Sequence, residues 1–168
     1  MTDDMQEGIE GELWADLMIW SFPLYYFSVP GLLKNFIDRQ LPMNLPFMEE
    51  QEGQTGSGGH PSRYDMSGKR HLLISTCGFY TAKNNYDSVT KLFDHVCGAG
   101  QYESIFCGQG ELFRVPELKA RTDEYLECVR QAGREYAQKQ AISEDAKEKL
   151  RELLYPRDVF EKMADAKV

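Results

Sequence analysis

A near-continuous apolar run, LWADLMIWSF at residues 13–22, limits the possible folds of this chain more than any other feature. Such a run is short for a helix and suits a strand buried on both faces of a sheet. Asp16 alone carries a charge, and Pro23 must end the strand because proline has no N–H for a sheet ladder. The chain is therefore expected to build a sheet that is covered on both sides.

Helix and strand patterns alternate along the rest of the chain. The predicted helices cover residues 29–39, 85–97, 116–139 and 143–155, and the further strands lie within 70–80 and 102–113. Residues 157–168 read as a short, frayed tail. Alternation of this kind implies an α/β fold with parallel strands joined by right-handed crossovers. We expect one domain over 1–168, with its core at 13–140 and a C-terminal helical extension at 143–168.

Residues 49–69 interrupt this alternation. The segment holds five glycines and almost no apolar side chain, which predicts a long flexible loop. A loop of this length is either a lid, with His60 and Tyr64 closing over a substrate, or a disordered insertion.

Charge and cysteine content exclude several classes of function. A net charge of −8 disfavours nucleic acids and anionic membranes as partners. No apolar run approaches the ~20 residues that span a bilayer, and the acidic start is unlike a signal peptide, so we expect a cytoplasmic protein. The four cysteines, Cys77, Cys97, Cys107 and Cys128, fit no zinc spacing, so free thiols and no metal site are expected.

Ligands of such sheets bind beyond the carboxyl ends of the strands, here residues 22–28, 75–81 and 107–113. The first of these loops, FPLYYFS, brings Tyr25, Tyr26 and Phe27 together. Adjacent exposed aromatic rings suit a flat aromatic ligand. They would equally suit a cover for the end of the sheet or an oligomer interface.

The second loop, STCGFY, follows the neighbouring strand. Thr76 offers a hydroxyl, and Gly78 lets the backbone approach a planar ring closely. Taken alone, the same residues describe a tight turn after a strand. The two loops together favour one shared ligand.

The stretch at residues 15–39 closely resembles a segment of the NADPH-dependent FMN reductases and flavodoxin-like quinone reductases. Ten residues fit that pattern: Asp16, Pro23, Tyr25, Ser28, Pro30, Leu33, Lys34, Phe36, Asp38 and Arg39. TCGF at 76–79 resembles the next flavin loop of the family, and the resemblance extends from the DDM at 3–5 to about residue 140. It implies a flavodoxin-like three-layer sandwich with a parallel sheet.

The resemblance also implies an FMN-dependent NAD(P)H oxidoreductase that passes hydride to a quinone, an azo or nitro compound, or a free flavin. In the family, one loop lies along the isoalloxazine ring and ribityl chain, and the next lies against the ring. The implied cofactor-binding residues are Pro23, Leu24, Tyr25, Tyr26, Phe27, Ser28, Thr76, Cys77, Gly78, Phe79 and Tyr80. No catalytic acid or base is expected, and Cys77 is either a modulator beside the ring or an inert buried thiol.

This sequence departs from the family at its start. The family begins with a strand, a phosphate-binding loop, a helix and a second strand, whereas the 12 residues before Leu13 contain no strand and no such loop. We therefore expect an N-terminally truncated fold that retains strands 3-4-5 of the order 2-1-3-4-5, with weak FMN binding. The strand at 13–22 would then be an edge that pairs in a homodimer or with a partner chain. A cofactor-free oligomerisation or interaction module is the alternative.

Overall fold

The computed structural model describes residues 4–48 and 59–165. Contacts group the chain into two compact units, one of Met1–Met18 with Gly31–Arg70 and the other of Ile19–Pro30 with His71–Val168. The expected single domain over 1–168 stays a prediction. In the described part, no helix is both long and apolar enough to cross a membrane.

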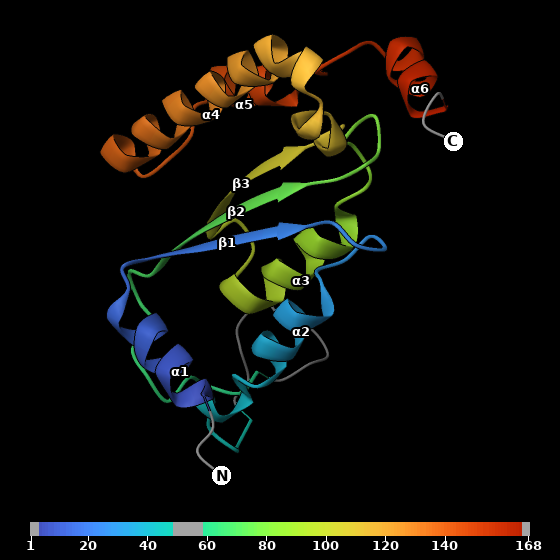
Figure 1. Cartoon of the computed structure of the whole chain (residues 1–168). Coiled ribbons are helices and arrows are strands. Elements are labelled where there is room, and N and C mark those ends of the chain that lie inside the picture. The colour runs from blue at the N-terminus through green and yellow to red at the C-terminus, as the bar shows by residue number, and fades with distance from the viewer. Residues whose placement is uncertain (1–3, 49–58, 166–168) are drawn as a thin grey trace. The chain divides into compact units, whose positions relative to one another are not determined.

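A three-stranded sheet lies mostly in the second unit. Its strands are β1 (Leu17–Pro23), β2 (Arg70–Thr76) and β3 (Tyr102–Cys107), in the order β1-β2-β3. β2 and β3 are parallel, with Thr76 opposite Cys107, and the three arrows run in the same direction in Figure 1. The predicted α/β fold with a parallel sheet is confirmed.

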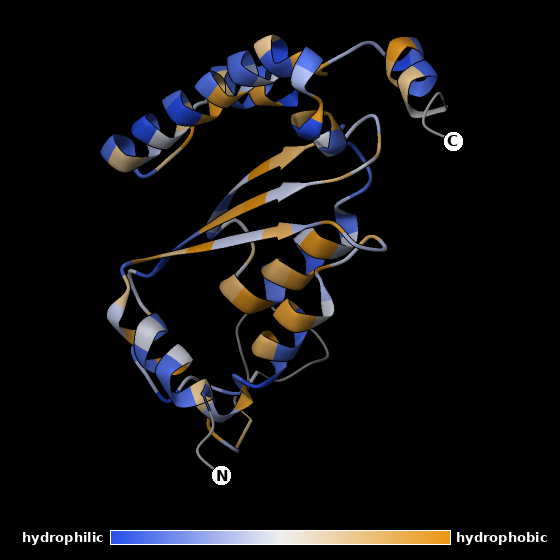
Figure 2. Ribbon diagram, viewed as in Figure 1, coloured by the Kyte–Doolittle hydropathy of each residue, from blue (hydrophilic) through white to orange (hydrophobic). Residues whose placement is uncertain are grey.

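Helix α3 (Asp87–Cys97) covers one face of this sheet through aromatic contacts. The fully buried ring of Phe93 lies 5.5 Å from the ring of Trp20 and 6.0 Å from that of Phe22. Figure 2 shows apolar residues on the side of α3 that faces the strands. The helical spacing predicted this apolar side correctly.

The opposite face carries α4 (Lys119–Lys139) and α5 (Glu144–Arg151), as Figure 1 shows. The Tyr125 hydroxyl donates to the Leu150 carbonyl at 3.3 Å, which joins these two helices. Lys147 pairs with Glu103 of β3 at 3.0 Å. The predicted N-cap of α5 is confirmed, because the Ser143 Oγ accepts a hydrogen bond from the Ala146 N–H. Helices on both faces confirm the three-layer arrangement.

The first unit contains helices α1 (Met5–Trp14) and α2 (Gly31–Asp38) and the short 3-10 helix η1 (Leu41–Met43). Gly8 allows a close approach here, because a Cβ at this position would lie 2.8 Å from the Phe36 ring. The Lys69 Nζ donates to the carbonyls of Leu13 at 2.6 Å and Ala15 at 2.7 Å. This ammonium satisfies carbonyls that the end of α1 leaves without helical partners.

Two expectations about the first strand are wrong. Leu13 and Trp14 belong to α1, so the strand begins at Leu17. It is also covered on one face only, because Trp20 and Phe22 are buried whereas the Ile19 side chain is 55% exposed. β1 lies at the end of the sheet, and α5 packs on β3 at the other end.

Two further segments differ from expectation. The predicted frayed tail contains helix α6 (Arg157–Asp165), in which Phe160 is buried. Of the predicted flexible loop, residues 49–58 lie outside the described residues. The rest is held by hydrogen bonds, with the Leu45 N–H donating to the Pro61 carbonyl and the Arg63 N–H to the Met43 carbonyl, both at 2.8 Å. Residues 59–69 are therefore not the free loop that their composition suggested.

Candidate functional site

The two aromatic loops meet at the carboxyl ends of β1 and β2. The Leu24 N–H donates to the Thr76 carbonyl at 2.9 Å. Beyond this bond, the rings of Phe27 and Phe79 stack with centroids 5.2 Å apart and planes 19° from parallel. All four residues belong to the same compact unit. The predicted convergence of the two loops is confirmed.

A tight turn at residues 25–28 presents the first loop. The backbones of Tyr25 and Ser28 exchange two hydrogen bonds of 3.0 Å. The central residues are left-handed, with φ of 52° at Tyr26 and 61° at Phe27, as in the turns that usually contain Gly or Asn. This conformation costs about 1–2 kcal/mol for each side chain that has a Cβ. The turn is also tied to α3, because the Ser88 hydroxyl donates to the Phe27 carbonyl.

The four exposed rings of these loops are here called the aromatic platform: Tyr25, Tyr26, Phe27 and Phe79. Tyr26 is 100% exposed and Tyr25 63%. Exposed rings on a strained turn make the platform a candidate binding surface for a flat apolar group or for another protein.

Residues 2–131 match the flavodoxin-like fold family. The chain belongs to this family. The matched range includes the three strands, the aromatic platform and most of α4.

Curated relatives of this flavodoxin-like chain are ribosyldihydronicotinamide dehydrogenases [quinone]. The mouse protein is 33% identical over 112 residues, which are 64% of this chain and 44% of the relative. The human protein is 37% identical over 81 residues, 46% of this chain and 29% of the relative. The chain thus spans less than half the length of these relatives. A solved FMN-dependent NADH-azoreductase of Bacillus anthracis is 20% identical with a TM-score of 0.41, covering 63% of this chain and 50% of that one.

The other predicted site residues differ in their exposure to solvent. Leu24 and Cys77 are buried, Ser28 is half-buried, and Pro23, Thr76 and Gly78 are exposed. Burial raises the pKa of the Cys77 thiol, which leaves it protonated and poorly reactive at neutral pH. This favours an inert role for Cys77. Flavin contact by any of these residues stays a prediction.

Tyr80 is the one predicted site residue that does not lie with the platform and its supporting residues. The Arg157 guanidinium lies 4.7 Å from the centroid of the Tyr80 ring, a cation–π contact. Tyr80 also lines a cavity beside β3, and no platform residue lines that cavity. Its ring therefore belongs to a different surface.

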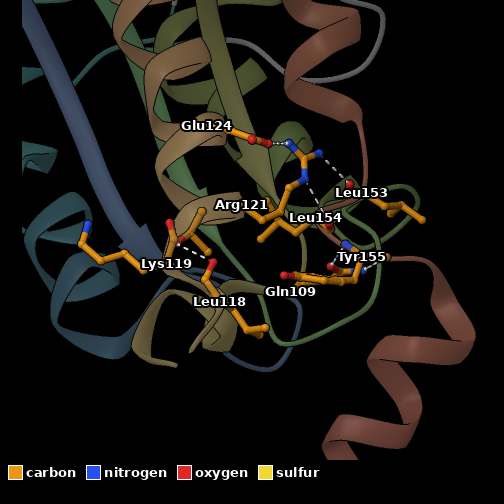
Figure 3. A network of polar contacts seen from close by, with 9 residues as sticks. Gln109, Leu118, Lys119, Arg121, Glu124, Leu153, Leu154 and Tyr155 are labelled. Atoms are coloured by element: carbon orange, nitrogen blue, oxygen red, sulfur yellow. Dashed lines mark hydrogen bonds and ion pairs between the residues drawn. The ribbon is translucent and has the colours of Figure 1, made fainter. Parts of the chain in front are cut away.

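A third loop, after β3, supports the site and was missed among the predicted residues. Gln109 is fully buried, and its N–H donates to the Phe79 carbonyl at 2.7 Å. Its side chain both donates to the Tyr155 carbonyl and accepts from the Tyr155 N–H at 2.8 Å. Figure 3 shows this clamp next to Arg121, which donates to the carbonyls of Leu153 and Leu154. Nothing in the local sequence around Gln109 signals a partner so far along the chain.

Close packing of glycine completes this third loop. A Cβ on Gly110 would lie 2.7 Å from the Thr76 Cβ, so a larger residue would push the two loops apart. The chain offers no group of three or more His, Cys, Asp or Glu side chains that could hold a metal ion, within residues 4–48 and 59–165.

Proposed function

We propose that this chain carries the ring-binding loops of an FMN-dependent NAD(P)H oxidoreductase of the quinone or flavin reductase type. One observation carries the proposal: the loops after β1 and β2 join through Leu24 and Thr76 and present stacked rings, Phe27 and Phe79, at their tip. In an open parallel sheet, this edge is where ligands bind.

The residues present fit the ring of a flavin better than its phosphate. The centroids of Phe27 and Phe79 are 5.2 Å apart, whereas a ring inserted between them would need about 7 Å. The isoalloxazine would therefore stack on the outer side of the platform. Gly78, which is exposed, allows the backbone of the second loop to approach the ring edge.

When bound, the flavin supplies the hydride chemistry. The chain's residues bind and orient it, and the rings exclude water from its face. Cys77 is kept neutral by burial, so no charged thiol lies beneath the platform. The name of a relative supports this assignment, since the mouse protein is a ribosyldihydronicotinamide dehydrogenase [quinone].

FMN affinity is expected to be low for this chain alone. The sequence that resembles the family includes no phosphate-binding loop. Three missing charge-assisted hydrogen bonds would cost about 4.5–9 kcal/mol, which is roughly a thousand- to a million-fold in affinity. A site that binds FMN with a dissociation constant of about 1 nM when it makes those bonds would bind it at roughly micromolar to millimolar without them.

The test is a titration of the purified chain with FMN, followed by quenching of flavin fluorescence. Phe27→Ala and Phe79→Ala should each weaken binding about tenfold or more, because each removes a stacking surface. Leu126→Ala, at an exposed position of α4, is the matched control and should bind as the wild type does. Absence of binding at excess FMN, or equal binding by all variants, would refute the proposal.

The free edge of β1 supports a second candidate, an interaction module. β1 has one strand neighbour in the described sheet, and its Ile19 side chain is 55% exposed. An unpaired strand edge of this kind recruits a further strand. We propose pairing at this edge, in a homodimer or with a partner chain, and a cytoplasmic location that suits the four free cysteines.

Light scattering and native mass measurement test this pairing. A dimer that dissociates when Ile19→Lys places a charge beside the edge supports it, with Leu126→Lys on α4 as the control. A monodisperse monomer at high concentration would contradict pairing between copies and leave the FMN titration unaffected.

A further inference from the structure

A cavity of about 640 Å³ lies along the outer edge of β3. Five consecutive residues of the strand, 102–106, line it together with residues 80–83 and part of the segment 147–154. Side chains alternate between the two faces of a strand, so a cavity that touches five in a row faces the edge of the strand. This edge has no strand neighbour in the described sheet, so it offers backbone N–H and C=O groups to whatever enters.

Fixed rings and leucines form the apolar walls of the cavity. Phe106 is stacked against Tyr86 with centroids 4.1 Å apart, and Tyr80 is held by Arg157 at 4.7 Å. Leu150, Leu153 and Leu154, from the end of α5 and the residues that follow it, complete the apolar lining. The Gln109–Tyr155 clamp, shown in Figure 3, ties this segment to the end of β3. The walls are therefore organised before any ligand arrives, and the volume suits a small molecule.

The charges around the cavity favour an anion. Lys83, Lys147 and Arg151 line it, against the carboxylates of Glu103 and Glu152. Lys147 pairs with Glu103 at 3.0 Å and also lies 3.3 Å from Glu144. Arg151 approaches the same Glu144 at 3.8 Å, which leaves Lys83 as the lining cation that can hold an anion. Lys83 makes no ion pair with any residue that the structure describes. A lining with more cations than carboxylates stands out in a chain whose net charge is −8.

We propose that the edge of β3 is a binding site for a small planar organic anion, a ring system that carries a carboxylate, sulfonate or phosphate. The ring lies among Tyr80, Phe106 and the leucines, its polar edge faces the backbone of β3, and its anionic group is held by Lys83. No residue of the aromatic platform lines this cavity. The site is thus separate from the proposed flavin site and does not depend on it.

Isothermal titration calorimetry with naphthoate tests the proposal, with uncharged naphthamide as the matched probe. Naphthoate should bind the wild-type chain at least tenfold more tightly than naphthamide does. Lys83→Gln should weaken naphthoate binding about tenfold or more, because it removes a charge-assisted contact. Ala82→Trp should abolish naphthoate binding by filling the cavity. If that variant does not fold, Leu153→Trp, at another lining position, should have the same effect.

Two control variants separate this site from other surfaces. Lys91→Gln removes an exposed lysine of α3 outside the cavity, and Phe27→Ala reduces the platform. Both should bind naphthoate as the wild type does, whereas Phe27→Ala should bind FMN about tenfold or more weakly. No heat of binding at millimolar naphthoate, equal binding of the two probes, or loss of naphthoate in Phe27→Ala would each overturn the proposal.

Discussion

The side-chain amide of Gln40 donates a hydrogen bond to the carboxylate of Glu12 within the first compact unit. Glu12 is buried in α1, and this burial raises the pKa of its carboxyl to about 7. The amide of Gln40 compensates for only part of the solvation that the carboxylate loses. Glu12 is therefore a group whose ionisation opposes folding.

The first prediction is that Glu12 makes the chain less stable as the pH rises. The unfolded carboxyl titrates near its ordinary pKa of 4.5, and the folded one near 7. Below the unfolded value both states hold the proton, so there is no penalty. Between the two values the unfolded state gains by ionising, so stability falls and the full penalty, up to about 3 kcal/mol, is reached above the folded pKa.

Thermal melting of wild type and Glu12→Gln at pH 5 and pH 8 measures this effect. The substituted amide keeps an acceptor for Gln40 but cannot ionise, so the variant should lose less stability at the higher pH. Glu10→Gln, an exposed neighbour on α1, should follow the wild type. An identical pH dependence in all three chains would show that burial of Glu12 has no energetic consequence.

A second prediction concerns the clamp between Gln109 and Tyr155. Gln109→Leu leaves the N–H and C=O of Tyr155 without the two 2.8 Å bonds that they make to this side chain. Each unsatisfied group costs about 1–3 kcal/mol when buried, and Tyr155 is half-buried, so we expect a loss of about 2–4 kcal/mol. Denaturant unfolding gives the free energy, and hydrogen exchange at the Tyr155 amide should accelerate.

Gln131→Leu provides the comparison for that clamp. Gln131 lies on the exposed side of α4 and reaches Glu127 at 3.5 Å. Its replacement should change the free energy of unfolding by less than about 0.5 kcal/mol. Equal losses in the two variants would mean that the clamp adds nothing specific.

The sequence predicted the elements whose cause is local and periodic. The apolar run that ends at Pro23 predicted β1, and the helical spacing around Phe93 predicted α3. The positions of the strand ends correctly predicted that Phe27 and Phe79 lie together. Features set by distant contacts were not predictable in the same way. The strand starts late because α1 continues to Trp14, where Lys69 binds the carbonyls at its end.

The candidate site shows the same division. Parallel strand order is enough to bring the two loops together, so their convergence followed from the alternation of patterns. The positive φ of Tyr26 has no sequence signal, since the turn contains neither Gly nor Asn. The Tyr80 ring is in a cation–π contact with Arg157 and not with the platform, and the Gln109 side chain is hydrogen-bonded to the backbone of Tyr155. Both partners come from the C-terminal extension, whose docking no local pattern reveals.

The strained turn supplies the third prediction. Tyr26 has φ 52° and a fully exposed side chain, so its ring contributes no packing to the folded chain. Asn tolerates this left-handed conformation better than Tyr does. Tyr26→Asn should therefore raise the free energy of unfolding by about 0.5–1 kcal/mol. Tyr26→Ala removes the same ring without relieving the backbone and should give no such gain; equal effects would place the strain elsewhere.

The final prediction tests what holds α3 on the sheet. Phe93 is fully buried and contacts the rings of Trp20, Phe22 and Tyr102 at centroid distances of 5.5, 6.0 and 6.3 Å. Phe93→Ala removes these contacts and leaves a cavity, which should cost about 3–5 kcal/mol in denaturant unfolding. Phe93→Leu fills much of that space and should cost clearly less, while the exposed Leu126→Ala should cost under about 0.5 kcal/mol. A loss in Phe93→Ala no larger than that of Leu126→Ala would mean that the aromatic layer between β1 and α3 does not stabilise this unit.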